Sequence, residues 1–348
     1  MICIAATLMS IAFLFNRNDN RSDAFEIREV WRFEVDDRSI DALEIAIAPD
    51  ASKFAIYERQ TEELRVFKGA DQKLLWQKQI SKQVVSKLVF SNTAKTLCIF
   101  DETQAILIDT EDGEVIAEHE FSCSLHDPTY EKVLDSPTEV FFSAKPARLV
   151  KVDFETGEET DVFALEDFED KFPEITKWLP DVPIGKLHHF EVTNGQMFGF
   201  QGGYLFRFDV EKQSFSWLTH FGEMPSCQGP LYVTPGNTLS GFLSGDMRPV
   251  RFDSRTGEVT AKLSLPNSQL LETPESEHYF LLNKTGKGRP TEFYILDSKG
   301  AALLSKKVLW KADSDGRLSI SSDGKFILTA LSAEGTCVLW KIIDVNGG

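Results

Sequence analysis

The chain has 348 residues, of which 42% are hydrophobic and 11% are aromatic, including 27 phenylalanines. Its 54 acidic and 37 basic residues give a formal net charge of −17, which argues against sequence-independent binding to DNA or RNA, because such binding needs clustered lysine and arginine. The phenylalanine-rich composition favours β-sheet over α-helix, and the length suits one large all-β domain.

The first 23 residues begin with an apolar run and are treated apart from the domain at residues 24–348. Ile2 to Phe15 is an unbroken run of apolar or small residues, shorter than the about 20 residues of a membrane span. Its length suits a signal peptide, although no lysine or arginine precedes it. Three interpretations are compatible with this run: a signal region, a short anchor and a misassigned start codon. A signal region implies an exported or periplasmic protein, and without one the protein is expected in the cytoplasm. Any membrane contact is expected through residues 1–23 only.

Residues 25–35 predict a strand that has no partner at its own end of the chain. Trp31, Phe33 and Val35 alternate with Arg32 and Glu34, which is the pattern of a half-buried strand.

From there to the C-terminus, one unit of four strands recurs with a period in the forties. Aspartates end the third strands of successive units at Asp109, Asp153, Asp209, Asp253, Asp297 and Asp344, with separations of 44, 56, 44, 44 and 47 residues. Glycine turns follow several of them. Because aspartate bonds the backbone two residues on and glycine tolerates positive φ, this combination is typical of tight hairpins.

Polar turns between first and second strands indicate seven such units. They lie at Pro49–Lys53, Ser91–Lys95, Asp135–Thr138, Val192–Gly195, Thr234–Asn237, Thr273–Ser276 and Ser321–Lys325. Seven units at this period predict an all-β, seven-bladed β-propeller with four antiparallel strands per blade. The seventh unit ends after its third strand, so the strand at 25–35 is predicted to complete it and to close the ring, which removes an unpaired sheet edge.

The longest aspartate spacing contains an insertion, Glu166–Lys186, with a short helix predicted around Pro173–Leu179. Phe172, Ile175 and Trp178 recur at i, i+3 and i+6, so they could contact a partner; a packed lid without a binding role is the alternative.

A second candidate surface is basic and lies in corresponding loops of blades 5 and 6. Its residues are Arg248, Lys284, Lys287 and Arg289. They could attract an acidic peptide, and solvated loop charges are the alternative.

No catalytic residue, metal ligand or cofactor is predicted. The five cysteines form no C-x-x-C pair and no Cys/His spacing that resembles a zinc site. Cys98 and Cys337 lie in apolar strand patterns, so both are expected in the core.

The last unit resembles a WD40 blade. Ser321–Ala330 and then Glu334–Trp340 follow that pattern, with Trp340 at the position of the family's tryptophan. Lys341 replaces the aspartate that normally follows, and the Gly-His pair of the family is absent from every unit. The related quinoprotein-like and YVTN propellers are similar in architecture.

The resemblance implies a non-catalytic scaffold, expected to be a monomer, that binds a protein or a peptide. The alternative is an enzyme or small-molecule binder that uses the central channel, as in quinoprotein-like dehydrogenases or lactonases. Fold alone does not decide between them.

Overall fold

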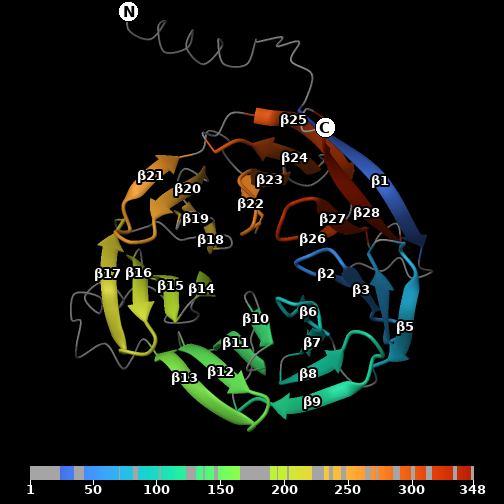
Figure 1. The fold of residues 1–348 in the computed structure, drawn as a ribbon, viewed down its shortest axis with the longest axis horizontal. Helices are drawn as coiled ribbons and strands as arrows, with labels where there is room; N and C mark the ends of the chain where they lie inside the picture. The colour runs from blue at the N-terminus through green and yellow to red at the C-terminus, as the bar shows by residue number, and fades with distance from the viewer. Residues whose placement is uncertain are drawn as a thin grey trace, which may run out of the picture.

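The computed structural model describes residues 24–34, 43–69, 71–80, 85–101, 103–122, 131–135, 138–144, 148–164, 189–193, 195–201, 204–221, 231–234, 238–243, 248–262, 268–271, 273–284, 291–298, 302–310, 316–331 and 335–345. These residues form seven four-stranded sheets and contain no helix. The sheets stand side by side around a central axis like the blades of a propeller (Figure 1). The predicted seven-bladed β-propeller is therefore confirmed.

The first four blades follow one another along the chain. Blade 1 consists of β2 (Leu43–Ile47), β3 (Lys53–Glu58), β4 (Glu63–Lys68) and β5 (Leu74–Gln79). Blade 2 consists of β6 (Lys87–Phe90), β7 (Thr96–Phe100), β8 (Gln104–Asp109) and β9 (Val115–Glu120). Blade 3 consists of β10 (Glu131–Asp135), β11 (Thr138–Ala144), β12 (Arg148–Asp153) and β13 (Glu158–Ala164). Blade 4 consists of β14 (His189–Thr193), β15 (Gln196–Gln201), β16 (Tyr204–Asp209) and β17 (Ser214–His220).

The remaining blades complete the circle. Blade 5 consists of β18 (Tyr232–Thr234), β19 (Thr238–Leu243), β20 (Arg248–Asp253) and β21 (Val259–Lys262). Blade 6 consists of β22 (Ser268–Leu270), β23 (Tyr279–Lys284), β24 (Thr291–Leu296) and β25 (Ala302–Trp310). Blade 7 consists of β26 (Gly316–Ile320), β27 (Phe326–Leu331), β28 (Thr336–Asp344) and β1 (Phe25–Glu34).

Aspartate and glycine build the turns between third and fourth strands. In blade 3, Asp153 Oδ1 accepts a hydrogen bond from the Glu155 N–H at 2.8 Å, and the Gly157 N–H donates to the Asp153 carbonyl at 2.7 Å. Asp253 and Gly257 repeat this arrangement in blade 5. Both glycines have a φ of 73°, a left-handed conformation that strains other L-residues. The predicted hairpin chemistry is therefore confirmed.

Strand β1 is the fourth strand of blade 7 and closes the ring. It pairs antiparallel with β28, from Phe25 opposite Asp344 to Glu34 opposite Thr336. In Figure 1 the first strand of the chain lies beside the last one. The predicted closure is confirmed over residues 25–34. Strand β1 pairs with the outer side of β28 and becomes the outer edge strand of blade 7 itself, so the sheet of this blade joins the two ends of the chain.

The core lies between neighbouring blades, because each sheet buries both of its faces. Adjacent residues of β12 show this clearly: Leu149 packs with Phe206 of blade 4, whereas Val150 packs with Phe142 and Cys98 on the side of blade 2. Successive side chains of a strand point to opposite faces, so blade 3 presents one face to each neighbour.

Candidate functional site

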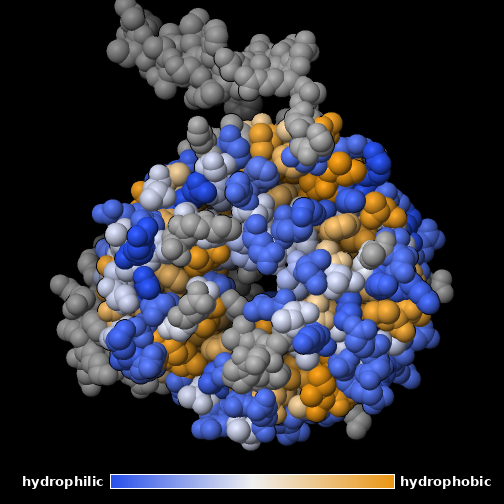
Figure 2. Space-filling view, viewed as in Figure 1, coloured by the Kyte–Doolittle hydropathy of each residue, from blue (hydrophilic) through white to orange (hydrophobic). Residues whose placement is uncertain are grey.

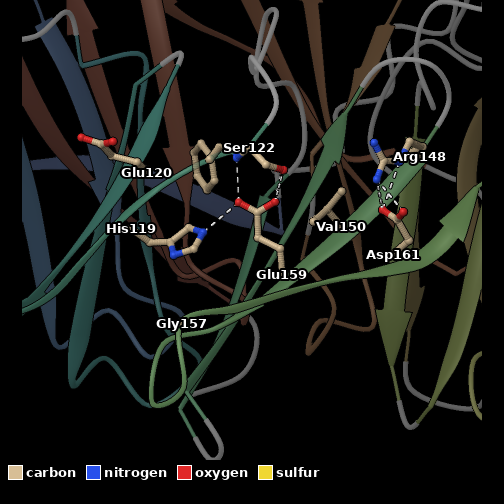
Figure 3. A pocket seen from close by; sticks show the side chains of 9 residues that line it. His119, Glu120, Ser122, Arg148, Val150, Gly157, Glu159 and Asp161 are labelled. Carbon is tan, nitrogen blue, oxygen red and sulfur yellow. Dashed lines mark hydrogen bonds and ion pairs between the residues drawn. The ribbon is translucent and has the colours of Figure 1, made fainter.

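A pocket of about 520 Å³ lies between the outer strands of blades 2 and 3. Strand β9 and the segment after it form one wall, and β12 and β13 form the other (Figure 3). The polar side chains that line these walls include His119, Ser122, Arg148, Glu159 and Asp161.

Glu159 connects the two walls of this pocket. Its Oε1 lies 2.8 Å from His119 Nε2 and accepts a hydrogen bond from the Ser122 N–H at 2.8 Å, and its Oε2 accepts one from the Ser122 hydroxyl. Burial opposes ionisation of this carboxyl, but the hydrogen bonds from Ser122 and His119 outweigh burial and lower the pKa of Glu159. The carboxylate therefore links blade 2 to blade 3.

These three residues do not form a hydrolytic triad. In a triad, the serine hydroxyl bonds the imidazole, and the carboxylate orients the far side of that ring. Here Ser122 and His119 both bond Glu159 (Figure 3). The serine hydroxyl is consequently bonded to a carboxylate, whose lowered pKa makes it a weak base, and not to the imidazole.

An arginine–aspartate ion pair lines the same pocket. Arg148 Nε donates to Asp161 Oδ1 at 3.0 Å, and Arg148 Nη2 contacts both carboxylate oxygens. These side chains are 27% and 41% exposed, so a bound partner can reach them.

Another pocket, of about 510 Å³, lies on the opposite side of blade 3, facing blade 4. Apolar walls come from Phe141, Val162 and Val192, and Asp161 borders this pocket as well as the first. Its charged wall is the ion pair of Lys151 Nζ with a Glu139 oxygen at 2.8 Å. Blade 3 is thus flanked by a polar pocket and by a more apolar one, with β13 between them.

A third charged group lies between blades 7 and 1. Glu44 of β2 is 4% exposed and accepts hydrogen bonds from Arg59 Nη2 at 2.8 Å and from Arg317 Nη1. Two guanidinium groups therefore compensate one buried carboxylate. On the face shown in Figure 2, hydrophilic residues form part of the rim of the central opening.

Cys98 and Cys337 are buried, as predicted, and burial raises the pKa of the Cys337 thiol to about 12. Within the described residues, no group of three or more His, Cys, Asp or Glu side chains is arranged to hold a metal ion. The same part of the chain contains no helix with the length and apolarity needed to cross a bilayer.

Comparison with known proteins identifies the fold. No protein-family model and no curated protein sequence matches the chain. The solved β-propeller domain of Myceliophteria thermophila Cps50 (Swd1) matches with a TM-score of 0.66 and 11% sequence identity, over 91% of this chain and 99% of that chain.

The chain has a WD40-like propeller fold. At this sequence identity the likeness extends to the fold and not to function.

The WD40-like propeller places two of the predicted basic residues at loop borders. Arg248 begins β20 and Lys284 ends β23, so both border the loops between second and third strands of their blades. Lys287 and Arg289 lie outside the described residues. The role of this set in binding stays a prediction.

The residues of the insertion, Phe172, Ile175 and Trp178, and the helix predicted around them also lie outside the described residues. Their contact with a partner stays a prediction too.

Sequence reasoning missed the residues around blade 3 of the WD40-like propeller. His119 and Glu159 are 40 residues apart, and Arg148 and Asp161 are 13 apart. None belongs to a recognisable motif, because packing of adjacent blades brings the first pair together. For the second pair, the available signal was the predicted Asp153–Gly157 turn, which makes β12 and β13 a hairpin.

Proposed function

We propose that this protein is a non-catalytic scaffold that binds an extended segment of a protein or a peptide along the outer edge of blade 3. One observation carries the proposal: β13 is the edge strand of its sheet, and a pocket lies on each side of it. The more exposed half of β13 runs from Glu158 to Asp161.

An extended segment that pairs with an edge strand points alternate side chains to opposite faces of the sheet. Beside β13, successive side chains of such a segment would point toward the two pockets in turn. Volumes of about 520 and 510 Å³ lie within the roughly 300–1,000 Å³ of ligand pockets. The matching segment alternates polar residues, for the pocket toward blade 2, with apolar residues, for the pocket toward blade 4.

The electrostatics of the first pocket also support binding over catalysis. Glu159 is occupied by Ser122 and His119, and Asp161 is occupied by Arg148. Paired charges of this kind orient and discriminate partners, whereas acid–base chemistry needs a group that is available to exchange a proton with a substrate.

Affinity capture with mass spectrometry tests the proposal. Asp161→Lys reverses a charge that borders both pockets, and Thr160→Arg places a large side chain in the pocket toward blade 4. The matched control is Glu258→Lys, which reverses an exposed charge beside the outer strand of blade 5.

We expect the control to capture the same proteins as the wild type. Both blade 3 variants should lose a defined subset, and a synthetic extended peptide from a lost partner should bind them at least about tenfold more weakly, equivalent to about 1.4 kcal/mol. Circular dichroism melting checks that the variants are folded. If folded variants capture the wild-type set and bind the peptide equally well, the proposal is wrong.

A further inference from the structure

Unsatisfied buried polar atoms concentrate in blades 5 and 6. Among the described residues, side-chain atoms of this kind without a hydrogen-bond partner include Ser240 Oγ, Arg251 Nε, Thr273 Oγ1, His278 Nδ1 and the Tyr279 hydroxyl. Buried polar groups in folded proteins nearly always have partners, so a concentration in two adjacent blades requires a physical reason.

Three of these residues converge at the interface of the two blades. Ser240 of β19 lies directly opposite Arg251 of β20, and residues paired in this way project from the same face of a sheet. The Cζ atom of Arg251 lies 4.5 Å from the ring centroid of Tyr279 of β23. Ser240 and Tyr279 are 0% and 2% exposed, so their hydroxyl groups are enclosed by protein.

The charge of Arg251 lacks a carboxylate partner in the part of the chain that the structure describes. Its Nη1 donates to the Ser298 carbonyl at 2.6 Å, which accepts a hydrogen bond but carries no net charge. Burial disfavours the charged guanidinium and lowers the pKa of Arg251. Arg65 of blade 1 differs, because it forms ion pairs with Glu58 and Glu63.

We propose that a small monovalent anion of the size of chloride binds between blades 5 and 6. The Nε–H of Arg251 donates to it, and the hydroxyl groups of Ser240 and Tyr279 are its other donors. Nε of a guanidinium can only donate, and a hydroxyl can donate or accept, so all three atoms suit an anion at once. Arg251 as a whole is half-buried, but its Nε is enclosed by protein. An anion beside Nε compensates the guanidinium charge on this enclosed side, which a water molecule cannot do.

Thermal unfolding tests the site in chloride or bromide against gluconate at constant ionic strength. We expect the wild type to gain melting temperature as the halide concentration rises, as linkage requires for a ligand of the folded state. Arg251→Met should abolish this gain. Ser240→Ala removes one donor and should weaken the apparent halide affinity roughly 5- to 10-fold.

Arg65→Met is the matched control, since it removes an arginine that already has carboxylate partners. It should lower the melting temperature but keep the halide dependence. A bromide-soaked crystal gives a readout independent of stability. Anomalous density should lie beside Arg251 Nε in the wild type, weaken in Ser240→Ala crystals and disappear in Arg251→Lys crystals.

Ordinary water beside Arg251 in bromide-soaked crystals would overturn the proposal. So would an equal halide response in the wild type and Arg251→Met. Ser240→Ala removes only one buried hydroxyl and should fold. Its halide dependence therefore tests the proposal even if Arg251→Met does not fold.

Discussion

The ring of Trp31 lies 4.9 Å, between centroids, from the ring of Phe54. Trp31 belongs to blade 7 through β1, and Phe54 belongs to β3 of blade 1. Phe67 of β4 lies against both rings, with centroid distances of 5.1 and 5.0 Å. This aromatic cluster joins the closing strand of the ring to the first blade.

Trp31→Ala is therefore expected to destabilise the protein by about 2 to 3 kcal/mol, since it removes a half-buried aromatic side chain and leaves Phe54 and Phe67 poorly packed. Denaturant unfolding measures the loss. The neighbouring exposed residue provides the control: Arg32→Ala should change stability by less than about 0.5 kcal/mol. Similar losses from the two variants would contradict a role for the aromatic cluster in closure.

Removal of residues 1–34 should cost at least about 5 kcal/mol, because a strand of hydrogen bonds and the buried side chains of Phe25 and Ile27 are lost together. Removal of residues 1–23 leaves β1 intact and should preserve the melting temperature. Calorimetry distinguishes the two truncations. If the protein without residues 1–34 melts as cooperatively and at the same temperature as the protein without residues 1–23, closure by β1 is refuted.

Gly257 and Gly157 share a φ of 73° but have different surroundings. A Cβ at position 257 would lie 2.6 Å from the ring of Trp217, which is held by its hydrogen bond to the Ser254 carbonyl at 3.0 Å. At position 157 nothing lies within 4 Å. Gly157→Ala should cost about 1 kcal/mol from backbone strain alone.

Gly257→Ala adds a steric clash to the same strain and should cost about 3 kcal/mol. Thermal unfolding of the two variants separates these contributions. An equal cost at both positions would show that Trp217 moves aside freely.

The link between blades 2 and 3 should depend on pH. The pKa of Glu159 is lowered in the folded protein, so its carboxylate stabilises the fold above the ordinary carboxyl pKa, and this contribution is lost as pH falls through the folded-state pKa. Glu159→Gln should reduce the free energy of unfolding by about 1 to 2 kcal/mol near neutral pH, and the difference from the wild type should shrink in acid.

Denaturant titrations over a pH series measure this difference. Glu118→Gln alters an exposed carboxylate on β9, the strand of His119, and should have little effect at any pH. A constant difference between Glu159→Gln and the wild type down to acidic pH would argue against ionisation of Glu159 as the cause.

Much of the architecture could be predicted because it depends on local chemistry. Asp153 and Gly157 bend the chain through hydrogen bonds within five residues, so the corners of the blades are visible in sequence. Trp31 and Phe33 alternate with charged residues, and this pattern identified β1 as a strand whose pairing partner is distant in sequence. The number of blades and the identity of the closing strand followed from these patterns.

The candidate site and the proposed anion site could not be predicted in the same way. Glu159 meets His119, and Arg251 meets Tyr279, only because two sheets pack face to face. The sequence by itself determined the strands, the turns and the closure of the ring, since hairpin chemistry and side-chain alternation act over a few residues. The tertiary structure alone decided which charges are paired and which buried donors lack a hydrogen-bond partner within the described residues, because those contacts depend on how neighbouring blades face one another.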